Sequence, residues 1–435
     1  MLTKLRIVNF KCLQDTGELD IRPLTFLVGP NSSGKTSVLQ MLLMLRQTVD
    51  SRDMENPLTP NDGWVKLGSY PDFIFGQDPK RKLEVNLFFQ GSLEPIRLES
   101  AMFHFNYNRK TTQIRLEMSE LRGDEGEVWG RVFRTHTGRR YRAEMVLTVE
   151  GKPEEMYGPL DVNVGKFYLA TEFHPKRSER RSLFMVRSLL LSLGLGIENE
   201  LKQVYYLGPL RDIPQRSYTI SGQAPMDVGT RGERTAEVLW YATRTKERQE
   251  EMLKEVNRWL QEFGIALEAR LERLGQSSQY QVLFVDPTSK LAVNLTDAGF
   301  GASQVLPVIV EGFYASSGSL LLVEQPEIHL HPRAQATLGS LLVEIAKRGD
   351  RRLIVETHSE HVLGRVQRHI AEEKIGRDEV AIYYFNPGPE GTQIQEVTLN
   401  EVGQFEEFPE GFFEEGFEEA IAHAKAISHR TARGT

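Results

Sequence analysis

A glycine-rich stretch, GPNSSGKT at residues 29–36, carries the strongest chemical signal in the sequence. It satisfies the pattern G-x-x-x-x-G-K-[S/T], in which glycines let the backbone turn tightly and approach oxygen atoms. Amides at the start of a following helix would favour a phosphate, Lys35 would reach the β- and γ-phosphates, and the Thr36 hydroxyl would ligate Mg²⁺. The stretch therefore predicts a site for a nucleoside triphosphate and Mg²⁺. The predicted nucleotide contacts are Asn31, Ser32, Ser33, Gly34, Lys35 and Thr36.

A second motif, LLLVEQPEIHLHP at residues 320–332, would supply the acid that such a site needs. An apolar run, expected to be a buried strand, leads into Glu324, which we expect to hold the metal together with Thr36. The next residue, usually a second acid that primes water, is Gln325 here. A neutral amide can orient water but cannot accept its proton as a carboxylate does. Two interpretations stay open: Gln325 positions the attacking water, or hydrolysis is slow and the bound nucleotide holds an assembly together.

Four further side chains near this motif are candidates for chemistry. Glu327 could replace the missing base, with a structural role in the turn before His329 as the alternative. His329 and His331 could ligate a metal, but the sequence offers no evident third ligand, so packing is the favoured interpretation. His358 ends another apolar strand, where it could hydrogen-bond the γ-phosphate or hold water; taken alone, it could equally be a capping or core histidine.

A glycine- and serine-containing stretch, GFGASQ at residues 299–304, opens an apolar helix before the acidic strand. Serine at the start of a helix is usually just an N-cap. Because this helix leads directly into the strand of Glu324, we instead expect Gly301 and Ser303 to form a second phosphate-binding end.

Other candidates lie outside these motifs. Arg211 could point at phosphate or at a neighbouring subunit, with a structural ion pair as an equal alternative. The basic stretches 134–142 and 174–181 could contact DNA or RNA, or form solvated loops. Residues 401–419 hold eight glutamates, five phenylalanines and no lysine or arginine, so we expect them to dock on the body or on a partner. Cys12 is expected in the core.

The elements that must position these residues alternate between strands and helices at both ends of the chain. Strands at the start precede residues 29–36, a helix follows, and strand–helix pairs recur between 281 and 385, which predicts an α/β fold with a parallel sheet. Short β-like stretches from 83 to 150 predict an antiparallel lobe, followed by a loop over 151–175 and then helices. The predicted organisation is 1–82 and 281–385 for the two parts of an ATPase head, 83–280 for an inserted β-rich and helical lobe, and 386–435 for a short acidic and aromatic C-terminal domain.

Bulk composition narrows the class of protein. The 435 residues are 40% apolar and 26% charged, with a net charge of −7, as in a soluble globular protein. The single cysteine excludes a disulfide within the chain and fits a reducing cytosol. We see no signal-peptide core at the start, and the longest apolar runs are too short to span a bilayer. We expect a cytoplasmic protein without a membrane anchor.

The order of the motifs resembles that of the ABC-type AAA-family ATPases, and most closely their RecF, SMC and OLD-like branch. The opening IVNFKCL and the PEIHLHP segment are typical of that branch. The combination also resembles a narrower bacterial group with a short C-terminal domain of unknown function. The motifs that carry this likeness are LGPLRDIP (207–214), GFGASQVLP (299–307), EQPEIHLHP (324–332), ETHSEH (356–361) and PEGFFEEGFEE (409–419).

This resemblance implies a P-loop NTPase of the ABC-head type that binds ATP and Mg²⁺. ATP would lie between two heads, with Ser303 of one copy facing the phosphates held by Lys35 of the other, so that the protein forms a homodimer or higher oligomer. Members of the branch act in DNA repair, chromosome handling or anti-phage defence, often with a separate or fused nuclease. The chain departs from relatives that carry long coiled coils, and residues 386–435 are too short for a nuclease domain.

Three functional hypotheses follow. The favoured one is a slowly or conditionally hydrolysing ATPase that assembles on ATP and controls a nucleic-acid-acting effector, such as a nuclease, in anti-phage defence. The second is a DNA repair or recombination ATPase that acts on DNA directly. The third is an ATP-locked scaffold that binds a protein partner with little hydrolysis. The candidate catalytic residues shared by these hypotheses are Glu324, Gln325, Glu327 and His358.

Overall fold

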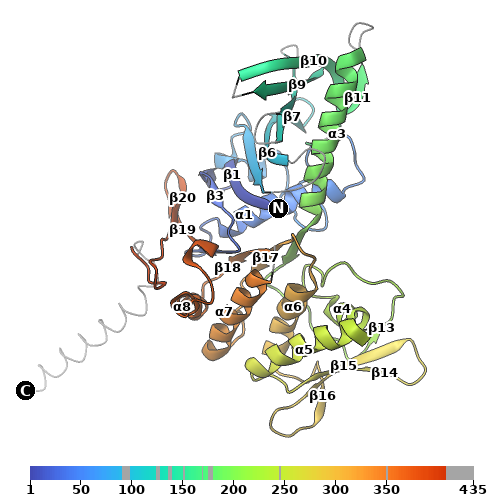
Figure 1. Ribbon diagram of the computed structural model, residues 1–435, viewed down its shortest axis with the longest axis vertical. Coiled ribbons are helices and arrows are strands. Elements are labelled where there is room, and N and C mark those ends of the chain that lie inside the picture. The colour runs from blue at the N-terminus through green and yellow to red at the C-terminus, as the bar shows by residue number, and fades with distance from the viewer. Residues whose placement is uncertain are drawn as a thin grey trace, which may run out of the picture.

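A mainly parallel sheet lies at the centre of the molecule (Figure 1). An antiparallel sheet forms one end, and helices with a small third sheet form the other. The structure is a computed structural model. It describes residues 1–90, 98–123, 128–135, 140–149, 152–168, 170–174, 180–243, 246–348 and 351–407.

The central sheet has six strands in the order β12-β17-β18-β4-β19-β20, of which the first five run parallel and β20 is antiparallel. All five residues of β4 and of β17 are buried, because helices cover both faces of the sheet. This arrangement confirms the predicted α/β class. The strands are β4 (Leu24–Val28), β12 (Val204–Leu207), β17 (Leu320–Glu324), β18 (Arg352–Glu356), β19 (Val380–Gly388) and β20 (Gly391–Glu396).

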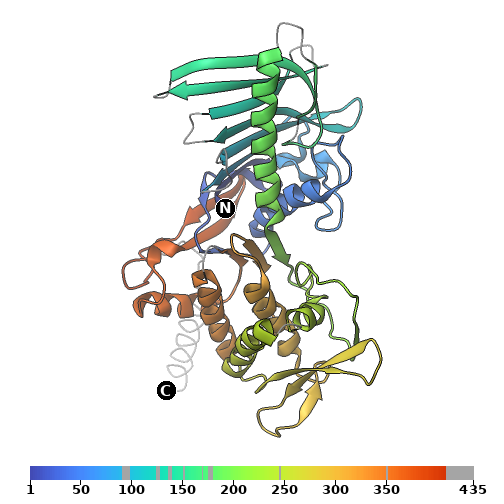
Figure 2. The ribbon, with the colours of Figure 1, turned by 45° about the vertical axis from the view of Figure 1, so that its right-hand side comes forward.

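Alternation along these strands divides the interior into two cores. In β4, Leu27 faces the core that contains helix α1, whereas Phe26 and Val28 face the core that contains α6, α7 and α8. Figure 2 shows the last three helices below the sheet. Helices α1, α7 and α8 each follow a strand of the central sheet, so their first turns lie at its carboxyl edge. The first turn of α6 lies there too, because Gly301 packs near His329 and Leu330, which follow β17. The helices are α1 (Lys35–Asp50), α6 (Phe300–Tyr314), α7 (Pro332–Lys347) and α8 (Glu360–Ala371).

An antiparallel sheet of ten strands forms the other end of the molecule, with helix α3 (Arg180–Lys202) lying along it (Figure 2). Its order is β11-β10-β9-β8-β7-β6-β5-β1-β2, and β3 pairs with β1. The strands are β1 (Leu2–Phe10), β2 (Leu13–Asp15), β3 (Leu19–Asp20), β5 (Leu83–Phe89), β6 (Leu98–Asn108), β7 (Gln113–Gly123), β8 (Val128–Arg134), β9 (Tyr141–Val149), β10 (Lys152–Val164) and β11 (Ala170–His174).

The predicted loop over residues 151–175 is wrong. Residues 152–164 and 170–174 are strands β10 and β11. The prolines and glycine that suggested a loop are accommodated where the pairing with β9 shifts register, between Pro153 and Glu155 and between Tyr157 and Leu160. Buried Leu160 and Val162 supply the alternating pattern that keeps the segment in the sheet.

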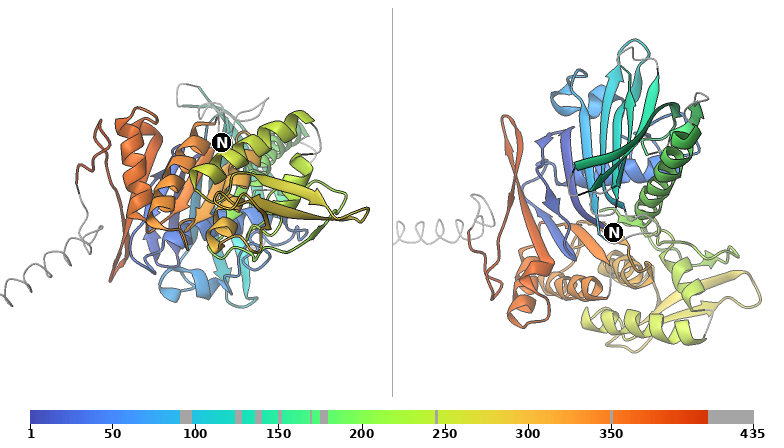
Figure 3. Two further views of the ribbon diagram at one scale, coloured as in Figure 1. Left: turned by 90° about the horizontal axis from the view of Figure 1, so that it is seen from below. Right: turned by 45° about the horizontal axis from the view of Figure 1, so that its top comes forward.

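A third, smaller sheet and two helices pack beneath α6 at the lower end, as Figure 3 shows from below. The buried side chains of α4 and α5 belong to the same core as those of α6. These elements are α4 (Thr235–Ala242), α5 (Lys246–Glu262), β13 (Tyr218–Thr219), β14 (Ala269–Arg273), β15 (Gln279–Val285) and β16 (Ala292–Asn294). Three short helical turns complete the described chain: α2 (Tyr70–Phe73), η1 (Phe75–Gln77) and η3 (Arg377–Glu379).

The strands of each sheet do not follow the predicted residue ranges. Strand β1 shares its sheet with β5–β11 rather than with β4, and β12, from within the range 83–280, is a strand of the central sheet. The division into four ranges stays a prediction. Residues 408–435 lie outside the described residues, as do four of the five phenylalanines of the acidic stretch. No helix in the described ranges is long and apolar enough to cross a membrane.

Candidate nucleotide-binding site

The loop of residues 29–34 joins β4 to α1 at the carboxyl edge of the central sheet. Gly29 and Gly34 have φ angles of 136° and 100°, which side chains rarely adopt. A Cβ on Gly34 would lie 2.5 Å from the Cys12 sulfur, so this glycine also permits close packing. Cys12 itself is half-buried at the edge of the first core. From β20, the Thr392 hydroxyl donates to the Ser33 carbonyl over 2.7 Å and holds the loop from behind.

The loop has the properties of a phosphate cradle. The Lys35 ammonium is only 3% exposed and donates to the carbonyls of Gly29 and Pro30, at 3.0 and 2.7 Å. Burial lowers its pKa, so an anion beside it would restore a favourable environment for its charge. The Ser33 hydroxyl is fully buried and has no hydrogen-bond partner in the described part of the chain. An orphan donor beside a buried cation fits a phosphate ligand.

Two carboxylates end neighbouring strands beside this loop. Glu324 of β17 and Glu356 of β18 are register partners in the parallel pair. The Thr36 hydroxyl donates to Glu356 Oε2 over 2.8 Å, and the Tyr206 hydroxyl donates to Glu324 Oε1 over 2.9 Å. Burial, with the nearby Glu356 charge, raises the pKa of Glu324 to about 7, and burial also raises that of Glu356. A hydroxyl and two carboxylates at one edge form an oxygen donor set that suits Mg²⁺.

The role of Glu356 was missed from the sequence, which singled out only Thr36 and Glu324 for the metal. A signal was present, because RLIVE in β18 ends on glutamate as LLLVE in β17 does. Two apolar strands that end on the same residue type, paired in parallel, bring their last side chains together.

Gln325 begins the turn after β17. Its φ is +42°. Its backbone N–H donates to the Glu356 carbonyl over 2.8 Å, and this hydrogen bond ties the turn to β18. The buried Glu327 accepts a hydrogen bond from the backbone amide of His358 at 2.7 Å. This contact favours the structural interpretation of Glu327, because its carboxylate positions the turn after β18.

His358 is exposed at the start of the turn between β18 and α8. Partial burial and the nearby charge of Lys35 lower the pKa of its imidazole, which favours the neutral form at neutral pH. A neutral imidazole beside the cradle can donate one hydrogen bond and accept another. This position fits the predicted contact with a γ-phosphate or with water.

The start of α6 differs from the sequence-based expectation. The N-cap is Gly299, and Ser303 lies inside the first turn with only 7% of its surface exposed. Ser303 lines a small cavity with Pro214 and Leu306. Gly301 is more exposed, so the backbone amides of the first turn are better placed than the Ser303 hydroxyl to meet a ligand of another copy.

Arg211 is buried against the acidic strand. It is 6% exposed, and its Nη2 lies 3.5 Å from the Glu324 carbonyl. Burial lowers the pKa of its guanidinium to about 10, while the neighbouring Tyr206 and Glu324 oppose the shift. Because the Arg211 side chain is buried in its own chain, a structural role is favoured over a contact with a neighbouring subunit.

His331 has a capping role. It is the N-cap of α7, and its Nδ1 accepts from the Arg333 amide over 3.4 Å. His329 is exposed, with a φ of +64°.

A known family accounts for this constellation. The family described as "AAA domain, putative AbiEii toxin, Type IV TA system" matches residues 24–364, from the first strand of the central sheet to α8. The chain belongs to this AAA family. The match includes the phosphate loop, both carboxylates and His358, and it confirms an ABC/AAA-type ATPase of the predicted branch.

Proteins similar to this AAA-family chain include a curated nuclease and solved SMC head domains. The OLD nuclease of Thermus scotoductus (strain ATCC 700910 / SA-01) is 24% identical over 373 residues, and the match covers 82% of this chain and 59% of the relative. The chain therefore spans less than two thirds of that relative. The SMC head domain from Thermotoga maritima is 13% identical, with 92% and 99% of the two chains covered and a TM-score of 0.42. An Smc head bound to the C-terminal domain of ScpA, derived from Pyrococcus furiosus, is 10% identical, with 98% and 99% covered and a TM-score of 0.45.

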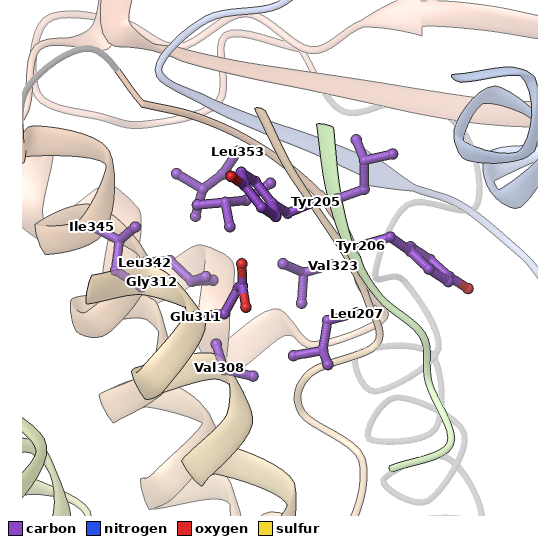
Figure 4. Close-up of a pocket in the computed structure, with 12 residues that line it drawn as sticks. Tyr205, Tyr206, Leu207, Val308, Glu311, Gly312, Val323, Leu342, Ile345 and Leu353 are labelled. Atoms are coloured by element: carbon purple, nitrogen blue, oxygen red, sulfur yellow. The ribbon is translucent and has the colours of Figure 1, made fainter. Parts of the chain in front are cut away.

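Behind the site of this AAA-family chain, α6 and the central sheet enclose a small apolar cavity. Figure 4 shows the Glu311 carboxylate pointing from α6 into this cavity beside Val323, while Tyr206 points away from it. Glu311 is 4% exposed; Oε2 accepts from the Val228 amide over 2.8 Å, and Oε1 has no partner in the described ranges. Burial raises the pKa of Glu311 to about 8.

The predicted nucleic-acid contacts fall only partly on described residues. Arg140 and Arg142 each lie 3.5 Å from a carboxylate oxygen of Asp161, and the Arg140 side chain is 75% exposed. Arg139 and residues 175–179 lie outside the described residues.

Proposed function

We propose that this chain binds ATP and Mg²⁺ between two copies of itself and hydrolyses ATP slowly. The observation that carries the proposal is the edge of the central sheet, where Thr36, Glu324 and Glu356 meet and Gln325 stands in the place of a carboxylate base. These oxygens beside the phosphate loop support a metal site, and the neutral Gln325 side chain, at the sequence position that usually carries a base, supports slow hydrolysis.

Each side chain has a defined role in this proposal. Lys35 and the loop amides bind the phosphates, and Thr36 with the two carboxylates holds Mg²⁺, which supplies charge neutralisation on the phosphates when bound. The Gln325 amide orients water without taking its proton, and His358 contacts the terminal phosphate. The first turn of α6 from a second copy, with Gly301 and Ser303, closes the site.

We further propose that ATP-dependent assembly controls an effector that acts on nucleic acid in antiviral defence. Two findings support this output: a curated relative is named a nuclease, and the family description names a toxin.

Sedimentation velocity of the full chain, with and without ATP and Mg²⁺, tests the assembly. We expect the nucleotide to shift the wild type to a dimer or larger particle and to leave Lys35→Ala unchanged. Lys110→Ala, at an exposed lysine in the turn between β6 and β7, is the matched control and should assemble normally. A wild-type profile that ATP does not move would contradict the shared site.

A direct role on DNA is the second candidate, because Arg140 projects from the antiparallel sheet with most of its side chain exposed. Duplex DNA would then stimulate turnover, and the stimulation would disappear on neutralising Arg139, Arg140 and Arg142. Equal turnover with and without DNA in the wild type would exclude this candidate.

A further inference from the structure

Helices α5, α7 and α8 lie on the side of the central sheet away from the antiparallel sheet (Figures 1 and 3). Their side chains line a groove, which we call the basic groove. Six basic and three acidic side chains line it, together with His369. Its cations are Arg258, Lys347, Arg348, Arg365, Arg368 and Lys374.

The acids of the groove do not balance these cations. At one end, Arg258 and Arg348 are paired with Glu255 and Glu344. At the other end, Arg368 and Lys374 share the single carboxylate of Glu372, and their hydrogen bonds lower its pKa to about 2. One carboxylate carries one negative charge, so Arg368 and Lys374 together keep a net positive charge.

Two cations of the groove have no acidic partner among the described residues. Arg365 donates to the Ser340 hydroxyl over 2.8 Å, and the same hydroxyl contacts His369 Nε2 at 2.8 Å. Lys347 is exposed, and the described residues place no carboxylate within ion-pair distance of it or of Arg365. The groove also has apolar walls, since Trp259 and Val343 line it. A ligand that carries several negative charges and apolar groups would match both features.

The sequence contains a segment with this chemistry, and the described chain ends near α8, one of the helices that border the groove. The segment from Glu401 to Glu419 has eight glutamates and five phenylalanines with no basic residue. Its beginning is anchored on α8: the Gln367 amide donates to the Gly403 carbonyl over 2.8 Å, and Phe405 packs on the core beneath. Glu401 also pairs with Arg377 at 2.7 Å.

We propose that the acidic segment of this chain, residues 410–419, binds in the basic groove of the same molecule. The segment leaves one side of α8, where Gln367 lies, and the groove cations Arg365 and Arg368 lie on another side of that helix. A helix with its side chains is about 10–12 Å across, and an extended chain covers about 3.3–3.6 Å per residue. Four to six residues, roughly, are therefore enough to pass around α8, so the segment can reach the groove from Glu407.

This docking would affect the nucleotide site through the helices that follow its two carboxylate-bearing strands. Helix α7 follows the Glu324 turn and α8 follows the His358 turn, so a segment bound between them would fix two elements that lead out of the site. The inference does not rest on ATP binding, because the groove and the segment are defined without it.

Zero-length carbodiimide cross-linking of the full chain, read by mass spectrometry, tests the docking. We expect bonds from Lys347 or Lys374 to a glutamate between 410 and 419, and their loss in Lys347→Arg/Lys374→Arg, because a guanidinium does not form the amide. In a mixture of light and isotopically heavy protein, each cross-linked pair of peptides should be all light or all heavy, because both peptides come from the same molecule. The ion pair of Lys82 and Glu117, at 2.7 Å, serves as the internal positive control.

Three outcomes would overturn the proposal. One is the absence of groove-to-segment bonds while the Lys82–Glu117 bond forms. Another is pairs of mixed isotope, which would assign the groove to a second copy. The third is an unchanged yield from Lys374 in Lys347→Glu, where we expect a several-fold loss. Lys110→Glu, a charge reversal outside the groove, should leave the yield intact.

Discussion

The Thr36 hydroxyl and the Glu356 carboxylate, 320 residues apart in the sequence, are joined by a hydrogen bond of 2.8 Å. The bond links the first turn of α1 to the end of β18, and thus the phosphate loop to the strand that precedes His358. It also presents an oxygen of each residue to the same small volume, where a metal would be held.

We predict that Glu356→Gln weakens Mg²⁺-dependent nucleotide binding by about tenfold or more, because it removes one charge from the metal-binding set. The amide oxygen can still accept from Thr36, so the fold should persist. Binding of a fluorescent ATP analogue with Mg²⁺ and with EDTA measures the effect. Glu360→Gln, at an exposed residue of α8, is the control. Equal loss in both variants, or none in either, would refute the metal role.

Nucleotide binding with Mg²⁺ should depend on pH near neutrality. Burial, with the charge of Glu356, raises the pKa of Glu324 to about 7, so this carboxylate is protonated below that pH and cannot hold the metal. Affinity for Mg²⁺ at fixed ATP should therefore rise between pH 6 and pH 8. Metal titrations at several pH values measure this dependence. Glu324→Gln should bind Mg²⁺ weakly, and its Mg²⁺ affinity should change less with pH. If the affinity of that variant still rises steeply between pH 6 and pH 8, a group other than Glu324 titrates.

Gln325→Glu should raise turnover. The backbone at this position is held by the bond to the Glu356 carbonyl, and glutamate has the size of glutamine, so the new carboxylate would occupy the same place and could accept a proton from water. We expect an increase of about tenfold or more in steady-state phosphate release, and a shorter-lived ATP-bound assembly. A collapse of turnover instead would identify the Gln325 amide as the catalytic group itself.

Glu311→Gln should stabilise the protein at high pH. Burial raises the pKa of Glu311 from its ordinary value of 4.5 to about 8, so between these values the unfolded chain releases a proton that the folded chain keeps. Its contribution to stability is therefore present below about pH 4.5 and is lost as pH rises toward 8. The amide oxygen of glutamine can still accept from Val228, so the variant should be more stable at pH 8 by about 1–3 kcal/mol.

Thermal unfolding midpoints of the wild type and Glu311→Gln at pH 5 and pH 8 measure this change. The gap between the two proteins should widen with pH. A gap that is constant or that narrows would show that Glu311 does not titrate in this range.

Sequence reasoning reached the parts of the site that depend on local pattern. The glycines and Lys35 identify the phosphate loop because their spacing is set within eight residues, and Glu324 is evident because an apolar strand leads into it. Glu356 was missed because its role depends on the pairing of β17 with β18, which spacing along the chain does not reveal. Ser303 shows another limit of local pattern: it was expected to open the helix, but α6 begins at Phe300, and Ser303 is 7% exposed and lines a small cavity with Pro214, which is distant in sequence. Its contact with a second copy stays a prediction.

The rear wall of the phosphate loop has a consequence for biosynthesis. Gly34 rests on Cys12, Gly29 lies against the Phe385 carbonyl, and Thr392 holds Ser33. A ribosome that has released only the first 350 residues has therefore exposed the whole GPNSSGKT motif, Cys12 and Glu324, but not Glu356, Phe385 or Thr392. We therefore expect nucleotide affinity to develop only after residue 392 has emerged. ATP would then bind late in synthesis and not to the early nascent chain.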